Sequence, residues 1–305
     1  MVASIDVIMP TCNSNKPYFP LVSKAIKENV PLNKIIIIDC FSNDGTVELI
    51  SKFFGRKALI LRTHANLAYA RYLGIKFVET DIFAMIDSDT MILPYWYLKL
   101  YRILSSDKKI GAVEGRLISS SKLTSQLPLT RIYNHSIILE KEKVNELSPT
   151  FILRRGLWWY VRGETTNVLI RREVVKDWKP LDNLGAFEDF HLTQHVLRKG
   201  YKWVRYERDV VAIHFELPKN PIKSLILKPI RKGLWHGSNL FILLKNMELD
   251  RKIVLLDNIR EITNSALKLF YKKDKEKYII SLLFAIAVDL GILVRDRYAQ
   301  QYRRR

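Results

Sequence analysis

The sequence predicts an α/β fold with a mostly parallel, mixed sheet flanked by helices and followed by a C-terminal helical extension. Short runs of aliphatic residues alternate with helical patterns in the first part of the chain, which is typical of consecutive βαβ units. Each run is almost entirely apolar, as expected for strands that helices cover on both faces. A chain of 305 residues, 48% of them hydrophobic, can bury such a core.

The individual elements follow one another in a regular order. We expect strands at 5–9, 34–38, 58–61 and 82–86, helices between them at 21–29, 46–54 and 65–78, and further strands at 111–118, 166–170 and 210–214. Pro218 and Pro221 resist both helix and central strand. We therefore expect a main domain over 1–218 and a basic, amphipathic helical extension over 219–305.

The charge of the chain is strongly positive. The formal net charge is +19, and residues 219–305 hold 19 Lys and Arg against 8 Asp and Glu, a net +11. Such a surface attracts anions: nucleic acid, anionic lipid or phosphorylated small molecules. A nucleic-acid-binding protein would account for the charge but not for the acidic motifs described below, and no recognition motif is present. We therefore expect no nucleic-acid partner.

The cysteines and the N-terminal residues indicate the cellular compartment in which the protein is expected. The two cysteines, Cys12 and Cys40, argue against a disulfide framework and fit a reducing compartment. Although they could meet in space, we interpret them as buried thiols. Residues 2–9 contain neither a basic region nor a long apolar stretch, so we expect no secretory signal peptide and a cytoplasmic protein.

Polar residues follow three of the predicted strands, and ligands of such sheets bind at the carboxyl ends of the strands. Asp87 and Asp89 flank Ser88 after a buried strand, where two carboxylates suit Mg²⁺ or Mn²⁺ shared with substrate phosphates. A solvated loop whose acids cap the next helix is the alternative. Asp39 could accept hydrogen bonds from a base or a ribose, and residues 10–13 could hold either group.

Four motifs carry a family resemblance. Residues 8–13, 37–46, 66–74 and 87–89 occur in the order and spacing of family 2 glycosyltransferases, which this chain resembles. The resemblance implies a GT-A fold over 1–218, inversion at the sugar, and a UDP-, GDP- or dTDP-sugar donor. The chain departs from the family at Cys12, where an aromatic residue is usual, and at Ala68, where a glycine is usual.

The resemblance also implies roles for single residues at the donor site. Asp39 is expected to read the nucleobase, Asp87 to lie near the ribose or the metal, and Asp89 to coordinate a divalent cation, Mn²⁺ or Mg²⁺, that bridges the diphosphate. The remaining nucleotide contacts are expected from Pro10, Thr11, Asn13, Asn66 and Arg71.

An inverting transfer also needs a general base for the acceptor and a positive centre for the leaving group. Residues 185–192 resemble the Glu-Asp motif of the family, which makes Asp189 the expected base and Glu188 a supporting acceptor-binding carboxylate. The favourable field at a helix N-terminus is a second explanation for these acids and is compatible with the first. His214 is expected to complete the metal ligands with Asp87 and Asp89.

Two further segments are weaker indications. Residues 163–172 resemble the family's glycine-then-strand segment, which carries donor and acceptor contacts. Trp158 and Trp159, between arginines, could stack on a sugar, lie at a lipid interface or anchor a core.

The C-terminal extension contains an apolar run at 279–294 with basic clusters on both sides. Its 16 residues are fewer than the roughly 20 that span a bilayer, and Asp289 lies within it. An interfacial or re-entrant helix on anionic lipid is one interpretation, and a helix packed on the catalytic domain is the other. A second basic amphipathic segment at 223–245 favours the membrane surface. We expect a peripheral protein at the inner face of the cell membrane.

These indications favour transfer of a single sugar to a hydroxyl or phosphate of a membrane- or lipid-linked glycan. Processive synthases carry an arginine-tryptophan motif after the base, and residues 194–200 contain none. Nucleotidyltransferases need a glycine-rich phosphate loop, which residues 10–13 do not provide. A catalytically silent relative that binds sugar or lipid remains the alternative.

Overall fold

The computed structural model describes residues 4–120, 155–156, 160–215, 227–247 and 275–294, with a few positions between 259 and 267. The chain forms two compact units. The first comprises 1–153, 161–179 and 192–216, and the second comprises 154–160, 180–191 and 217–305. Trp158, Trp159, the boundary at 218–221 and the basic clusters at 272–273 and 295–305 lie outside the described residues.

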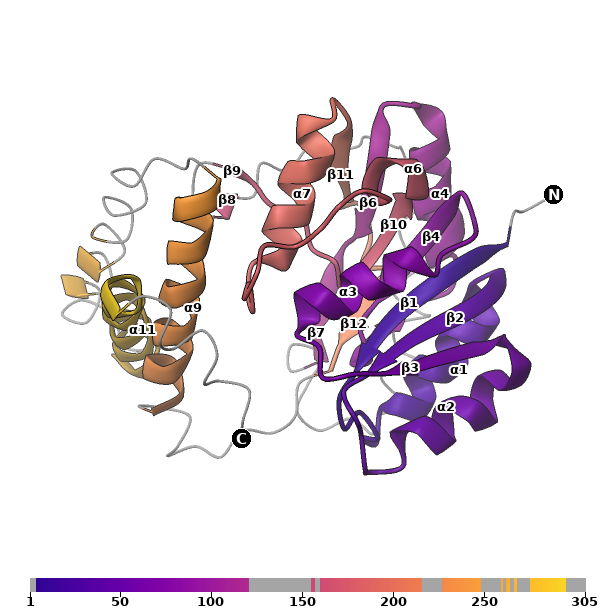
Figure 1. Cartoon of the computed structure of the whole chain (residues 1–305), viewed down its shortest axis with the longest axis horizontal. Helices are drawn as coiled ribbons and strands as arrows, with labels where there is room; N and C mark the ends of the chain where they lie inside the picture. The colour runs from indigo at the N-terminus through magenta and orange to yellow at the C-terminus, as the bar shows by residue number, and fades with distance from the viewer. Residues whose placement is uncertain are drawn as a thin grey trace. The chain divides into compact units, whose positions relative to one another are not determined.

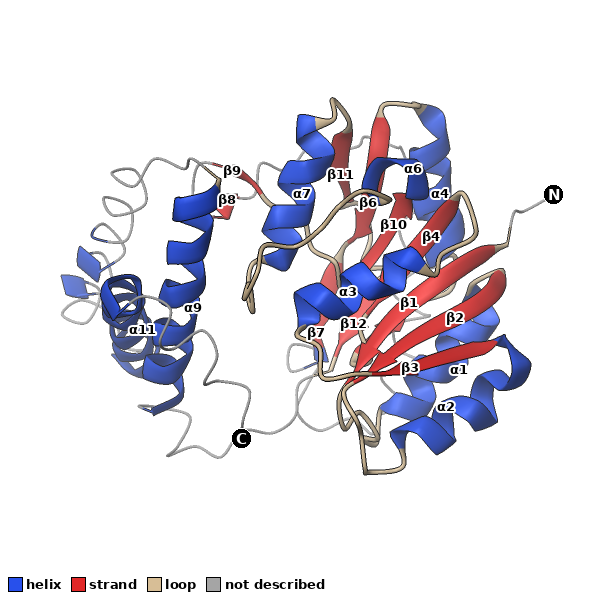
Figure 2. Cartoon of the chain, in the orientation of Figure 1, coloured by secondary structure: helices blue, strands red, loops and turns tan. Residues whose placement is uncertain are grey.

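Helices and strands alternate along most of the first unit as expected, and the elements of both units follow here in chain order (Figures 1 and 2). The strands are β1 (Ile5–Thr11), β2 (Leu32–Asp39), β3 (Ala58–Arg62), β4 (Ile82–Ile86), β5 (Thr90–Ile92), β6 (Ile110–Gly115), β7 (Leu117–Ser119), β8 (Arg155–Gly156), β9 (Tyr160–Val161), β10 (Asn167–Arg171), β11 (Lys202–Tyr206) and β12 (Ala212–His214). The helices are α1 (Phe19–Asn29), α2 (Thr46–Phe54), α3 (Leu67–Lys76), α4 (Trp96–Ser106), α6 (Arg172–Val175), α7 (Glu188–Arg198), α9 (Leu227–Asn246) and α11 (Lys275–Val294), with a short 3₁₀ helix at Gly55–Lys57.

The main sheet has seven strands in the order β11-β6-β10-β4-β1-β2-β3. β1 pairs in parallel with β2 and β4, β2 with β3, and β6 with β11, whereas β10 runs antiparallel to β4 and β6. A smaller sheet has the order β5-β12-β7, and β8 pairs with β9. The prediction of a mostly parallel, mixed sheet is therefore confirmed. The single strand expected at 111–118 is in fact two strands, β6 and β7, which belong to different sheets.

Successive side chains of a strand point to opposite sides of the sheet. Here both sides are covered, and the strands therefore carry apolar residues at nearly every position. On one side Ile5, Val7 and Met9 of β1 pack with residues of α1, α2 and α4. On the other side Ile8 packs with α3, α6 and the later part of α7. Figure 2 shows helices on both faces of this sheet. This two-sided burial explains why the strand sequences lack polar alternation.

The second unit is centred on α9 and α11, which lie side by side (Figure 1). Glycines allow the two backbones to approach closely: a Cβ on Gly237 would meet the carbonyl oxygen of Val288 and lie 2.8 Å from the Cα of Gly291. An apolar cluster joins this pair to the segment before α7, with members Leu184, Ala186, Phe187, Phe190, Leu240, Ile242, Leu243, Leu244, Met247 and Val288. In the described part of the chain, no helix combines the length and apolar character needed to cross a membrane.

The close approach of α9 and α11 can be tested with Gly237→Ala. In a helix whose surroundings had room, alanine would be favoured by about 1 kcal/mol. Here the added methyl group meets rigid backbone of α11, so we expect a net loss of about 1–3 kcal/mol in the free energy of unfolding. Urea unfolding followed by tryptophan fluorescence measures it. Lys245→Ala at an exposed position of α9 is the control, and equal or higher stability of Gly237→Ala would contradict the packing.

Candidate active site

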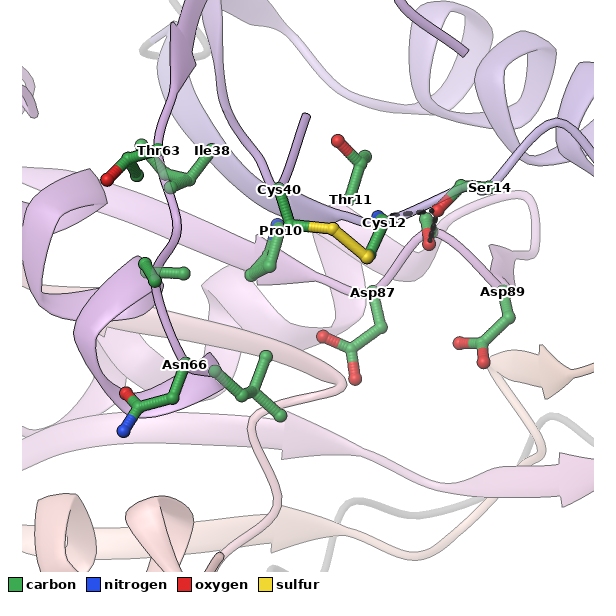
Figure 3. A pocket seen from close by; sticks show the side chains of 14 residues that line it. Pro10, Thr11, Cys12, Ser14, Ile38, Cys40, Thr63, Asn66, Asp87 and Asp89 are labelled. Atoms are coloured by element: carbon green, nitrogen blue, oxygen red, sulfur yellow. Dashed lines mark hydrogen bonds between the residues drawn. A yellow bond between two sulfur atoms is a disulfide. The ribbon is translucent and has the colours of Figure 1, made fainter. Parts of the chain in front are cut away.

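A pocket of about 310 Å³ lies at the carboxyl ends of the central strands (Figure 3). Loops that follow β1, β2, β3 and β4 line it, and five of the predicted site residues are among the lining residues: Pro10, Thr11, Asn66, Asp87 and Asp89. The carboxylates of Asp87 and Asp89 lie on the same side of the pocket in Figure 3. This is the edge where a parallel sheet is expected to bind its ligand.

Cys12 and Cys40 form a disulfide, with 5.0 Å between their Cα atoms. The interpretation as buried thiols was therefore wrong: Cys12 is exposed, Cys40 is half-buried, and both line the pocket. The pairing follows from parallel neighbours, because β1 and β2 end together and the Cys40 amide donates to the Thr11 carbonyl at 2.9 Å. The number of cysteines consequently no longer indicates a reducing compartment.

Asp39 is fully buried behind the pocket and accepts hydrogen bonds from residues of three segments. Its Oδ1 accepts from the hydroxyls of Thr11, at 3.0 Å, and Ser42, and its Oδ2 accepts from the Ser42 amide at 2.9 Å. Arg62 Nε donates to the same Oδ2 at 3.2 Å. These four donors occupy about all the lone-pair sites of a carboxylate, so Asp39 holds the ends of β1, β2 and β3 together.

Two residues near the ends of β2 and β3, Phe41 and Arg62, were missed by the sequence reasoning. Besides contacting Asp39, Arg62 donates from Nη2 to the Ser42 carbonyl at 2.8 Å, and its guanidinium lies 5.3 Å from the ring centroid of Phe41. Phe41 is 45% exposed and has a φ of 59°, a conformation that bulky residues rarely adopt. Arg62 ends a strand without a recognisable motif, so no sequence signal could have identified it.

The buried Arg71 pairs with Asp87, which lines the pocket. Arg71 is only 1% exposed, and its Nη2 lies 2.8 Å from Asp87 Oδ1. Burial raises the pKa of the Asp87 carboxyl, and the charge of Asp89 raises it further, while Arg71 opposes both. Arg71 thus lies behind Asp87, where its charge favours the ionised form of that side chain.

Asp89 and His214, two of the expected metal ligands, lie side by side. His214 Nε2 and Asp89 Oδ2 are 3.3 Å apart, and both side chains are about one-third exposed, at 32% and 36%. β12 brings them together, because His214 pairs with Thr90 of β5 and the Phe215 amide donates to the Asp89 carbonyl at 2.8 Å. Among the described residues, no group of three or more His, Cys, Asp and Glu side chains forms a complete metal site.

Further hydrogen bonds order the loops around the pocket. Ser14, which the sequence reasoning also missed, lies 2.8 Å from Ser88 through the two hydroxyl oxygens and so connects the first loop to the Asp87-Ser88-Asp89 turn. Asn66 caps α3 by accepting from the Tyr69 amide at 2.7 Å. The amide of Asn13, which has a φ of 49°, donates to the Ser42 hydroxyl at 2.8 Å.

The glycine-then-strand segment is tied to neighbouring strands. Gly163 packs against the ring of Trp203, leaving no room for a side chain, and its amide donates to the Thr193 hydroxyl at 2.9 Å. Asn167 accepts from Trp96 Nε1 at 3.1 Å and donates to the Gly115 carbonyl at 3.1 Å. These contacts give the segment a structural role in the first unit.

Glu188 and Asp189 open α7 and belong to the second unit. Their exposed fractions are 7% and 8%, and Asp189 Oδ1 accepts from the Phe190 amide at 2.7 Å. Two acids in the first turn of a helix are stabilised by the positive end of its dipole. Phe187, immediately before them, has a φ of 63°.

The comparisons with known proteins decide the family. A family model described as "Glycosyl transferase family 2" matches residues 6–178, more than half of the chain. The chain belongs to glycosyl transferase family 2. It is a glycosyltransferase, as the resemblance implied, and a search of curated proteins found no significant match.

Solved structures agree on the fold of this family 2 enzyme. The structure resembles S. aureus TarS 1-349, with a TM-score of 0.54, 14% identity, and coverage of 94% of this chain and 81% of that one. It also resembles S. aureus TarS 1-349 in complex with UDP-GlcNAc, with a TM-score of 0.55, 13% identity, and coverage of 93% and 79%. At this identity the likeness concerns the fold alone, and it confirms the predicted GT-A architecture.

The disulfide of this family 2 enzyme leads to a stability prediction. Cys12 and Cys40 are separated by 28 residues, and closing a loop of that length stabilises a protein by about 3–4 kcal/mol at most in the chain-entropy model. We expect the double variant Cys12→Ser, Cys40→Ser to unfold at a lower urea concentration than the wild type. The reductant TCEP should lower the urea midpoint of the wild type in the same way. The double variant with TCEP is the control. Two reactive thiols in the unreduced native protein would refute the bond.

Proposed function

We propose that the protein is an inverting glycosyltransferase that moves a single sugar from a nucleotide-diphosphate sugar to an acceptor. The observation that supports this most strongly is the convergence of four strand-end loops on one pocket that carries Asp87 and Asp89. A nucleotide and its diphosphate need such a site, with backbone and short polar groups for the nucleoside and hard oxygen ligands near the phosphates.

The donor is a UDP-, GDP- or dTDP-sugar in this proposal. The structural neighbour TarS was solved with UDP-GlcNAc, which makes a UDP-sugar the first to test. Pro10, Thr11, Asn13 and Asn66 would contact the nucleoside from the loops, with Asp87 near the ribose. Asp39 would act on the base mainly by holding these loops, because its carboxylate already accepts four hydrogen bonds.

The residues at Asp89 fit a divalent cation, Mn²⁺ or Mg²⁺. Two ligands of one such ion, each about 2.1 Å from it and at right angles, lie about 3 Å apart, close to the 3.3 Å between Asp89 and His214. Asp87 lies in the same pocket, and diphosphate oxygens would supply further ligands. A bound cation would neutralise the negative charge of the departing diphosphate.

Asp189 is the proposed general base. It would accept the proton of the acceptor hydroxyl as that oxygen attacks the anomeric carbon from the side opposite the diphosphate. The bond between the anomeric carbon and the diphosphate oxygen breaks, the nucleoside diphosphate leaves with the electron pair, and the configuration inverts. Glu188 would hold the acceptor beside Asp189. Where the acceptor is a phosphate, its oxygen is already ionised and the base is not needed.

The first experiment is nucleoside diphosphate release from UDP-, GDP- and dTDP-sugars, with membrane extract as the source of acceptor, before and after EDTA. We expect Asp189→Asn to lower kcat by about 10²- to 10⁴-fold, the usual contribution of a general base. Asp89→Ala should remove the response to added Mn²⁺. Asp81→Asn, an exposed aspartate at the opposite end of β4, is the matched control. Full activity in both site variants would disprove the assignment.

The acceptor is proposed to be a membrane- or lipid-linked glycan, met by a peripheral protein at the cytoplasmic face of an anionic membrane. Residues 219–305 carry a net charge of +11. In α11, Ile279, Ile286 and Leu290 are 38%, 42% and 48% exposed and lie seven and four residues apart, which places them on one face. An exposed apolar face on a basic segment is suited to the surface of anionic lipid.

Vesicle binding tests this part of the proposal. We expect the double variant Ile286→Gln, Leu290→Gln to bind phosphatidylserine-containing vesicles roughly tenfold or more weakly, because two half-exposed apolar side chains can no longer enter the lipid. Leu98→Gln on α4, with a similar exposed fraction of 47%, is the control. Equal binding of both variants and the wild type would contradict an interfacial α11.

A further inference from the structure

The backbone just before the Glu188-Asp189 pair has an uncommon conformation. Phe187 has a positive φ of 63° although it is a bulky residue, and Asn183, an asparagine that adopts this region more readily, has a φ of 61°. A bulky side chain in this region is strained and persists only where its surroundings hold it. The segment 184–187 therefore depends on contacts that keep it in place, and the start of α7 depends on the segment.

Asn239 of α9 supplies the polar contacts. It is fully buried, and its Oδ1 accepts two backbone hydrogen bonds, from Gly185 at 2.6 Å and from Ala186 at 3.1 Å. Its Nδ2 donates to the Trp235 carbonyl, one turn earlier in α9, at 2.7 Å. Without this side chain, two amides of the segment would lose their acceptor in the interior, which proteins avoid.

Neighbouring residues of α9 also contact the segment through ring contacts and close packing. The ring of Phe187 meets His236 edge-on at 5.1 Å, and His236 in turn meets Phe284 of α11 at 5.5 Å. Gly185 lies so close to α9 that a Cβ would approach Trp235 Nε1 to 3.2 Å and Asn239 Oδ1 to 3.5 Å.

These contacts come from one side of α9. Trp235, His236, Asn239, Leu240 and Leu243 follow at helical spacing and form one face. All of them belong to the second unit, together with the segment 184–187 and the Glu188-Asp189 pair. The C-terminal extension thus takes part in shaping the start of the proposed catalytic helix.

We infer that Asn239 is a positioning residue for the transfer reaction. It fixes the backbone of 184–187 so that α7 begins at Glu188 and presents Asp189 in the geometry that proton transfer requires. The inference rests on the proposed role of Asp189 as the base. A small displacement of a catalytic group can cost about 10²-fold in rate, so the effect belongs in kcat.

The test uses the whole chain, the donor that the nucleoside diphosphate release experiment identifies, and an acceptor with a hydroxyl group. We expect Asn239→Leu to lower kcat at least tenfold while the KM for the donor changes less than about threefold, because the pocket residues belong to the first unit. Asn239→Asp keeps an oxygen that can accept from both amides but, as a carboxylate, cannot donate to the Trp235 carbonyl, so it should recover only part of kcat. Where Asn239→Leu does not yield folded protein, Asn239→Ala removes the same acceptor with less added bulk and carries the same expectation.

Two controls separate positioning from general stability. Asn246 makes the same bond to the carbonyl one turn earlier in α9, at 2.7 Å from Ile242, but is exposed, so Asn246→Leu should leave kcat unchanged. Ser238 is fully buried next to Asn239, and Ser238→Ala controls for a buried change in the same turn.

The outcomes are distinguishable. A wild-type kcat in Asn239→Leu would overturn the positioning role, while an inactive Asp189→Asn left the proposed function standing. A wild-type kcat in Asp189→Asn would overturn the assignment of the base and the positioning role with it. A loss in kcat that Ser238→Ala reproduces would also overturn it.

Discussion

The set of hydrogen bonds to the buried carboxylate of Asp39 is the interaction on which the pocket at the strand ends depends. A charged group without exposure is tolerated only when donors surround it, and the four that serve Asp39 come from the end of β1, the loop after β2 and the end of β3. Satisfying this one carboxylate brings three strand ends together. The parallel register of β1 and β2 then sets Cys12 beside Cys40 and allows the disulfide.

The acidic turn after β4 is divided between two environments. Asp87 is held from the interior by Arg71, whose charge offsets part of the cost of burying the carboxylate. Asp89 is more accessible and faces His214 from the smaller sheet. One residue of separation therefore gives Asp87 a buried cationic partner and leaves Asp89 the more exposed of two carboxylates that both line the pocket.

Several features of the site could be predicted and others could not. Asp87, Asp89 and Asn66 were identified because short motifs recur at strand ends and helix starts, and the structure places all three at the pocket. His214 was predicted from the family resemblance, which implies a histidine after α7, and its side chain lies beside Asp89. The cysteines were misjudged because composition describes how often disulfides occur and not which strand ends meet. Arg62 and Asn239 escaped notice because each acts on a segment distant in the chain.

The sequence by itself determined the α/β architecture, the family and the strand-end motifs, since these depend on hydrophobic periodicity and on residues close together in the chain. The tertiary structure decided which side chains meet: Cys12 with Cys40 across 28 residues, Arg62 with Asp39 across 23, and Asn239 with Gly185 across 54. Local patterns cannot encode such pairs, because the contact arises only when strand register and helix packing bring the two segments into hydrogen-bonding distance.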